Sequence, residues 1–114
     1  MAVTTFCAPL LPGKTEAWKQ AVAEIGGPRA ADWDDMQRRN GITRQVVSLQ
    51  RTPDGDFVCV FLEGDDPNAT LGGLFTSDHP FDKWFADTIL IGTHGMSREE
   101  GPPPPNQVFV DWIT

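Results

Sequence analysis

Residues 76–85, TSDHPFDKWF, hold the densest group of side chains in this chain that could do chemistry. His79, one of only two histidines, stands between Asp78 and Asp82. An imidazole titrates near neutral pH, and a neighbouring carboxylate can orient its ring. The stretch therefore predicts a general acid or base, His79, with Asp82 as its orienting partner.

The same stretch also fits the start of a helix. Ser77, Asp78 or His79 can serve as the N-cap. Pro80 suits the first helical turn, and Asp82 favours the positive end of the helix dipole. A metal site would need a third nearby ligand, which this stretch lacks, so we expect no bound metal. The catalytic and the structural interpretations both stay open at this point.

Other candidate residues lie in the segments on either side. Arg44 could bind a carboxylate or enolate through two parallel hydrogen bonds, or it could be an edge arginine paired with an acid. His94 lies in the proline-rich connection 93–107 and could act as a lid residue. We expect the lining of a substrate pocket to include Trp84, Trp33, Phe61, Glu63 and His94.

Composition limits the classes of protein that the chain can belong to. A length of 114 residues indicates one domain, residues 1–114. The net charge of −7 argues against nucleic-acid binding, which needs a basic surface. No apolar run approaches the roughly 18 residues that span a membrane, and the N-terminus lacks the pattern of a signal peptide. We therefore expect a cytoplasmic protein.

The two cysteines, Cys7 and Cys59, form neither a disulfide framework nor a zinc-binding spacing. We expect both to be small buried hydrophobes in strands rather than reactive groups. The chain has no tyrosine, so proton transfer must use other groups. It also lacks a glycine-rich phosphate loop, and we expect no bound organic cofactor.

Hydrophobic periodicity and turn residues predict the order of the elements. We expect helices at 14–27, 28–42 and 79–92, and strands at 2–11, 42–52, 57–64 and 108–114. Thr15 and Asp32 are the expected N-caps of the first two helices, and Asn40-Gly41 is the expected stop of the second. The turn-rich stretch 65–78 is expected to hold one short helical turn. Pro53-Asp54-Gly55 joins two of the strands as a hairpin. This order is the ferredoxin-like βαββαβ pattern, an α+β fold in which helices cover one face of a four-stranded antiparallel sheet. The first and third strands should then be neighbours, with Cys7 near Cys59.

The third strand is apolar on both of its faces. Alternation places Phe57, Cys59 and Phe61 on one face and Val58, Val60 and Leu62 on the other. Helices can cover only one of these faces, and large exposed apolar patches are rare on monomers. We therefore expect a homodimer in which the uncovered sheet faces of two copies pack together.

Three stretches resemble the dimeric α+β barrel superfamily, which includes antibiotic-biosynthesis monooxygenases, small polyketide cyclases and L-rhamnose mutarotases. LLPGKTEAWKQAV is similar to its first strand-to-helix junction. DWDDMQRRNGITRQVVSLQ is similar to the mutarotase pattern of a Trp-containing helix, a Gly-Ile turn and a strand, although Trp33 is followed by Asp34. SDHPFDKWF is similar to the His-Pro-x-His helix start of cyclase-like members, with Asp82 where they have the second histidine.

The resemblance implies a small enzyme without a cofactor, acting on a hydrophobic or polyketide-like molecule. The reaction would be proton transfer of the cyclase, isomerase or lyase type, or cofactor-free oxygenation. His79, Asp82 and Arg44 would be the catalytic residues. Two alternatives stay open: a non-catalytic ligand-binding or stress-response dimer, and an accessory protein that recruits a partner through its proline-rich loop.

Overall fold

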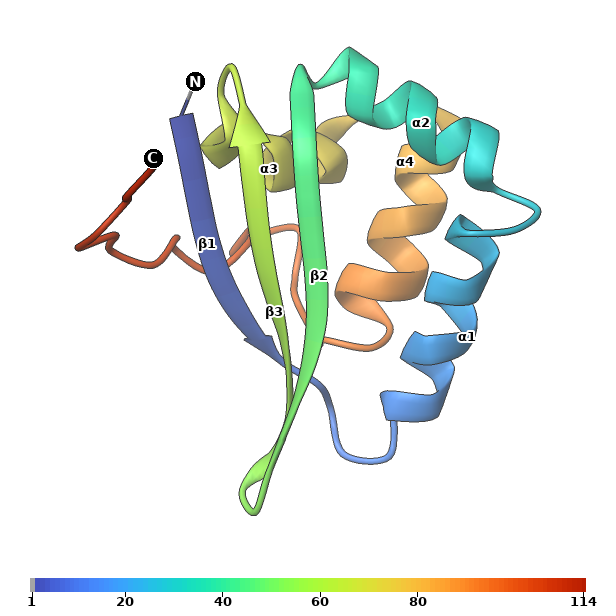
Figure 1. Cartoon of the computed structure of the whole chain (residues 1–114). Helices are drawn as coiled ribbons and strands as arrows, with labels where there is room; N and C mark the ends of the chain where they lie inside the picture. The colour runs from blue at the N-terminus through green and yellow to red at the C-terminus, as the bar shows by residue number, and fades with distance from the viewer. Residues whose placement is uncertain (1) are drawn as a thin grey trace.

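A computed structural model describes residues 2–114 and shows an α+β fold (Figure 1). Its strands are β1 (Ala2–Pro9), β2 (Ile42–Thr52) and β3 (Gly55–Gly64). Its helices are α1 (Thr15–Ile25), α2 (Ala30–Arg39), the short 3-10 helix η1 (Pro67–Ala69), α3 (Thr70–Thr76), α4 (Pro80–Phe85) and the π-helix η2 (Ala86–Ile91). The strands form one antiparallel sheet in the order β1-β3-β2, and the helices lie on one of its faces.

The expected hairpin and strand neighbours are confirmed. β2 and β3 pair on either side of the turn at residues 53–54, and β1 pairs with the other edge of β3. Phe6, Val58, Val60 and Leu62 point toward the helices and are buried. The opposite surface of the sheet, called here the outer face, carries the alternating residues, including Val46 and Phe61. Both faces of β3 are thus apolar, as the alternation predicts.

The first two helices form as expected, but their caps differ. Trp18 and Ala21 of α1 are buried on its apolar stripe. Thr15 is the first helical residue rather than the N-cap, and its hydroxyl donates to Asp56 at 2.7 Å. α2 begins before Asp32, at Ala30. It ends at the turn where Gly41 adopts a left-handed φ of 64°, so the helical stop at Asn40-Gly41 is confirmed.

The second half of the chain is more helical than its turn-rich sequence indicates. Residues 67–76 form η1 and α3, where only one short turn was expected. The last predicted helix begins at Pro80 but changes to π-helical hydrogen bonding at Ala86. π-Helical turns occur often at functional sites, because the extra residue shifts the face that later side chains present. Ile89 and Leu90 are both buried in this turn.

The prediction of a fourth strand at 108–114 is wrong for the single chain. The segment forms no strand and runs outward from β1 (Figure 1). Just before it, the backbone N–H of Asn106 donates to the carbonyl of Thr5 at 2.7 Å. Phe109, Val110 and Trp112 are 86%, 82% and 77% exposed. Both sides of the segment carry apolar residues, and one chain offers no second layer to cover them.

No helix within residues 2–114 is long and apolar enough to cross a bilayer.

Candidate functional site

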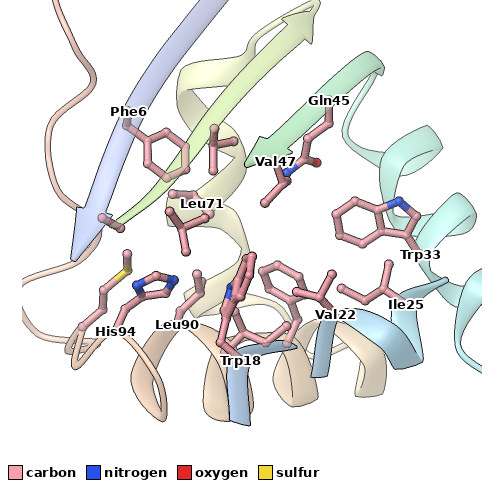
Figure 2. Close-up of a pocket in the computed structure, with 16 residues that line it drawn as sticks. Phe6, Trp18, Val22, Ile25, Trp33, Gln45, Val47, Leu71, Leu90 and His94 are labelled. Carbon is pink, nitrogen blue, oxygen red and sulfur yellow. The ribbon is translucent and has the colours of Figure 1, made fainter. Parts of the chain in front are cut away.

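An apolar cavity lies between the inner face of the sheet and the helices (Figure 2). Its volume is about 100 Å³. Every major element contributes to the wall, through residues that include Phe6, Trp18, Trp33, Val60, Leu71 and Phe85. Their side chains enter because alternate residues of the strands and one stripe of each helix face the core. The enclosure suits an apolar group the size of a single ring.

Among residues 2–114, His94 is the one ionisable side chain in the wall of this cavity. It follows η2, where the hydroxyl of buried Thr93 donates to the carbonyl of Ile89 at 2.6 Å and fixes the start of the loop. His94 Nδ1 lies 2.9 Å from the carbonyl oxygen of Pro9. A carbonyl only accepts, so Nδ1 carries the proton and Nε2 keeps a free lone pair.

Burial lowers the pKa of His94 from its ordinary value of 6.5, because the low-polarity surroundings disfavour the imidazolium. The hydrogen bond to Pro9 opposes this shift in part. The ring is therefore neutral at neutral pH, with Nε2 ready to accept a proton. This is the protonation state that a general base requires.

A second, more open hollow adjoins the cavity at His94. His94 and Met96 line both spaces. The outer hollow has a volume of about 290 Å³ and is bordered by the loop from Gly95 to Pro103, including Glu100. The imidazole thus stands between an apolar interior and a polar entrance.

Gln45 is the other polar side chain whose amide reaches the cavity. Its Oε1 accepts a hydrogen bond from Gln37 Nε2 at 2.7 Å. That bond orients the Gln45 amide and leaves its NH₂ group as the end able to donate to a bound molecule. In Figure 2, His94 and Gln45 stand on opposite sides of the group of lining residues.

His79 occupies a different position from His94, since it caps α4. Its Nδ1 accepts from the backbone N–H of Phe81 at 3.2 Å, as the structural interpretation of the stretch predicts. His79 Nε2 lies 3.7 Å from the carboxylate of Asp35, and the side chain is 39% exposed. His79 is absent from the cavity wall.

Asp82 forms a buried ion pair with Arg39 instead of orienting His79. Both carboxylate oxygens accept from the guanidinium at 2.9 Å, and Ser77 donates to the same carboxylate at 2.7 Å. The guanidinium of Arg39 lowers the pKa of Asp82, overcoming the opposing effect of burial. This pair joins the end of α2 to the first turn of α4.

Arg44, Phe61 and Glu63 lie on the outer face of the sheet, away from the cavity. Arg44 stands opposite Glu63 across β2 and β3, and its guanidinium carbon lies 5.7 Å from the centre of the Phe61 ring. Trp84 packs beside the core, with the guanidinium of Arg29 3.9 Å above its ring. Among the predicted site residues, the structure brings Trp33 and His94 together in the cavity wall.

Sequence reasoning missed Gln45, and it placed His94 in the pocket lining without predicting its burial or its bond to Pro9. Gln45 has a strand position with no local motif, so only its pairing with Gln37 reveals it. His94 was expected to be a lid residue, because its proline-rich surroundings suggest exposure. Within residues 2–114, no cluster of three or more His, Cys, Asp or Glu side chains is arranged to hold a metal ion.

Comparisons with known proteins bear on the fold. No protein-family model and no curated protein sequence matches the chain. The structure is similar to that of an L-rhamnose mutarotase from Formosa agariphila, with a TM-score of 0.66 and 11% identity over 99% of this chain and 100% of that one. It is also similar to tetracenomycin F2 cyclase from Streptomyces glaucescens, a type-II polyketide cyclase, with a TM-score of 0.60 and 18% identity over 100% and 99%. The fold expected from the resemblance to dimeric α+β barrel proteins is confirmed.

Proposed function

We propose that the chain is a small cytoplasmic enzyme of the isomerase or cyclase type, with His94 as its general base. The observation that carries this proposal is the bond from His94 Nδ1–H to Pro9, which presents an unprotonated Nε2 at an apolar cavity. The mutarotase and the polyketide cyclase of the same fold support chemistry of this general type on small molecules.

The two joined hollows indicate the shape of the substrate. A small apolar group, such as one ring, fits the inner cavity, and a more polar extension fits the hollow bordered by Glu100. A carbonyl beside the ring would lie near His94, where the two hollows meet. An enolisable ketone or polyketide-like compound has these parts.

The proposed reaction is a proton transfer in which no external oxidant or reductant takes part. Nε2 of His94 removes a proton from the carbon beside the carbonyl, and the electron pair of the C–H bond moves into an enolate. Charge that develops on the enolate oxygen is stabilised more by a hydrogen bond in an apolar site than in water. Return of the proton to another carbon isomerises the substrate, and attack of the enolate on a second carbonyl closes a ring.

The test follows exchange of the α-protons of phenylacetone in D₂O by NMR, with wild-type protein and His94→Asn. Asparagine keeps a donor for the Pro9 carbonyl but has no base at the position of Nε2. Removing a general base reduces the rate by about 10²- to 10⁴-fold, so exchange with the variant should fall toward the buffer rate.

His79→Asn is the matched control. Asparagine is a good N-cap, so this variant keeps the start of α4, and its exchange rate should equal that of the wild type. If His94→Asn were as active as the wild type, or if His79→Asn alone lost activity, His94 would not be the base. The second result would instead support His79 as the catalytic group.

A non-catalytic ligand-binding protein is the second candidate. The small number of polar groups in the cavity wall favours it, because apolar burial alone can hold a ligand. Saturable binding of phenylacetone to the wild-type protein with no exchange above the buffer rate would support this alternative over the enzyme.

We also propose that two copies pair through the outer face of the sheet. Val46 on this face is 43% exposed, and the apolar C-terminal segment starts from the neighbouring edge at Asn106. In a two-fold dimer, each copy would cover the outer face and the C-terminal segment of the other copy. The contacts would be the same on both sides of the two-fold axis.

A further inference from the structure

The two cysteines of the chain lie directly opposite each other on the outer face. Cys7 of β1 pairs with Cys59 of β3 in the register of the sheet. Both are free thiols, and their sulfur atoms are 3.7 Å apart. The expectation that both are buried is wrong, since Cys7 is exposed and Cys59 is half-buried. They are on the outer face because Phe6 and Val60, their neighbours in the chain, occupy the inner one.

We infer that Cys7 and Cys59 form a dithiol site that closes to an intrachain disulfide on meeting a small-molecule disulfide such as oxidised glutathione. Directly opposed residues of antiparallel strands have Cα atoms about 4.5–5.5 Å apart, within the range that a disulfide spans. Rotation of the two side chains can therefore bring the sulfur atoms to bonding distance while the strands stay paired.

The exchange proceeds in two balanced steps. The thiolate of exposed Cys7 attacks one sulfur of oxidised glutathione, forms a mixed disulfide and releases one glutathione thiolate. The thiolate of Cys59 then attacks the Cys7 sulfur and releases the second glutathione. The protein loses two protons and two electrons, and the small-molecule disulfide gains them.

The proximity of Cys59 determines which product accumulates. Burial raises the pKa of the Cys59 thiol, and the contact with Cys7 adds to this shift. Cys59 therefore reacts slowly with an external disulfide but rapidly with a mixed disulfide beside it, because the second step is intramolecular.

The site is coupled to the cavity through the strands that carry it. Cys7 lies between Phe6 and Ala8, and Cys59 lies between Val58 and Val60. All four of these neighbours line the apolar cavity. The disulfide would join the two strands that form this wall. It would also act close to the C-terminal segment, since Asn106 Nδ2 lies 3.9 Å from the Cys7 sulfur.

Pairing of two copies through the outer face would cover both thiols, so the test uses full-length Val46→Asp, which weakens that pairing, beside the wild type. Each protein is treated with excess oxidised glutathione and alkylated with iodoacetamide under denaturing conditions, and its intact mass is measured. Alkylation should fall from two groups to none, with no glutathione adduct and no covalent dimer. The bond would close a loop between residues 52 positions apart, so the melting temperature should rise by about 10 °C or more until dithiothreitol is added.

Cys7→Ser and Cys59→Ser are the matched controls, since each keeps one of the two thiols. They should show at most one glutathione adduct and no rise in melting temperature. Two stable glutathione adducts, two free thiols in Val46→Asp after treatment or a disulfide between chains would each overturn the inference. These readouts do not depend on turnover, so they stand apart from the proposed reaction.

Discussion

His94 and His79 show how hydrogen bonds give the same side chain two roles. His94 donates through Nδ1 to Pro9, which leaves Nε2 free to accept. His79 accepts through Nδ1 from the backbone N–H of Phe81, so its lone pair caps the start of α4. The first arrangement suits proton transfer in a cavity, and the second suits a cap.

At the residue scale, His94 should make stability depend on pH. Its pKa is lowered by burial in the folded protein, whereas the unfolded chain has about the ordinary value of 6.5. Between these two values the unfolded chain binds more protons, so acid favours unfolding. The contribution is therefore complete above about pH 6.5 and is lost as the pH falls through the folded pKa.

Urea unfolding at pH 7 and pH 5 would measure this effect. The wild type should lose more stability on acidification than His94→Asn, because its unfolded chain takes up a proton that the folded protein resists. His79→Asn should retain the His94 contribution. Equal losses in the wild type and His94→Asn would show that burial of His94 does not disfavour its charged form.

The two roles differ in how well the sequence predicts them. A serine, a histidine and a proline before an apolar stripe indicate a helix start, and Ser77, His79 and Pro80 form one. Nothing local to His94 indicates burial, because its environment is built by β1, η2 and the loop together. Long-range packing of this kind has no signature in neighbouring residues.

At the element scale, local chemistry predicts some boundaries and tertiary contacts decide others. The hairpin follows from the turn residues Pro53-Asp54-Gly55 and is found as expected. The change from α to π hydrogen bonding at Ala86 has no comparable signal. The residues next to Asp82 in the sequence also do not predict its ion pair, because its partner Arg39 lies 43 residues away.

We expect Asp82→Asn to loosen the contact between α2 and α4. The variant loses the charge that accepts two hydrogen bonds from Arg39 and one from Ser77. Removing one partner of a buried pair costs about 3–5 kcal/mol, but Arg39 is 34% exposed and water can recover part of this. The expected loss in the free energy of unfolding is about 2 kcal/mol, measured in urea.

Asp35→Asn is the control for that prediction. Asp35 also accepts from Arg39, at 2.8 Å, but it is 54% exposed. Exposed pairs of this kind contribute about 0.5 kcal/mol or less. Equal losses in the two variants would mean that burial of Asp82 adds nothing to the pair.

At the scale of the whole molecule, one chain leaves two apolar surfaces without a covering layer. One is the outer face of the sheet, and the other is the C-terminal segment, where Val110 and Ile113 are 82% and 77% exposed. Residues 108–114 have the residue pattern of a strand, but a strand also needs a hydrogen-bonded neighbouring strand along its length. Within residues 2–114, the backbone bond that joins this region to β1 runs from Asn106, just before the segment, to Thr5.

Pairing of two copies would give both surfaces a covering layer, and light scattering tests it. The wild type at micromolar concentration should have the mass of two chains. Val46→Asp on the outer face and Phe109→Asp in the C-terminal segment should each raise the dissociation constant roughly a hundredfold, since a buried unpaired charge costs about 3 kcal/mol or more. Ala23→Asp, on the exposed side of α1, should leave the dimer unchanged. A wild type with the mass of one chain would contradict the pairing. A dimer weakened by Ala23→Asp but unaffected by the other two substitutions would place the interface on the helices instead.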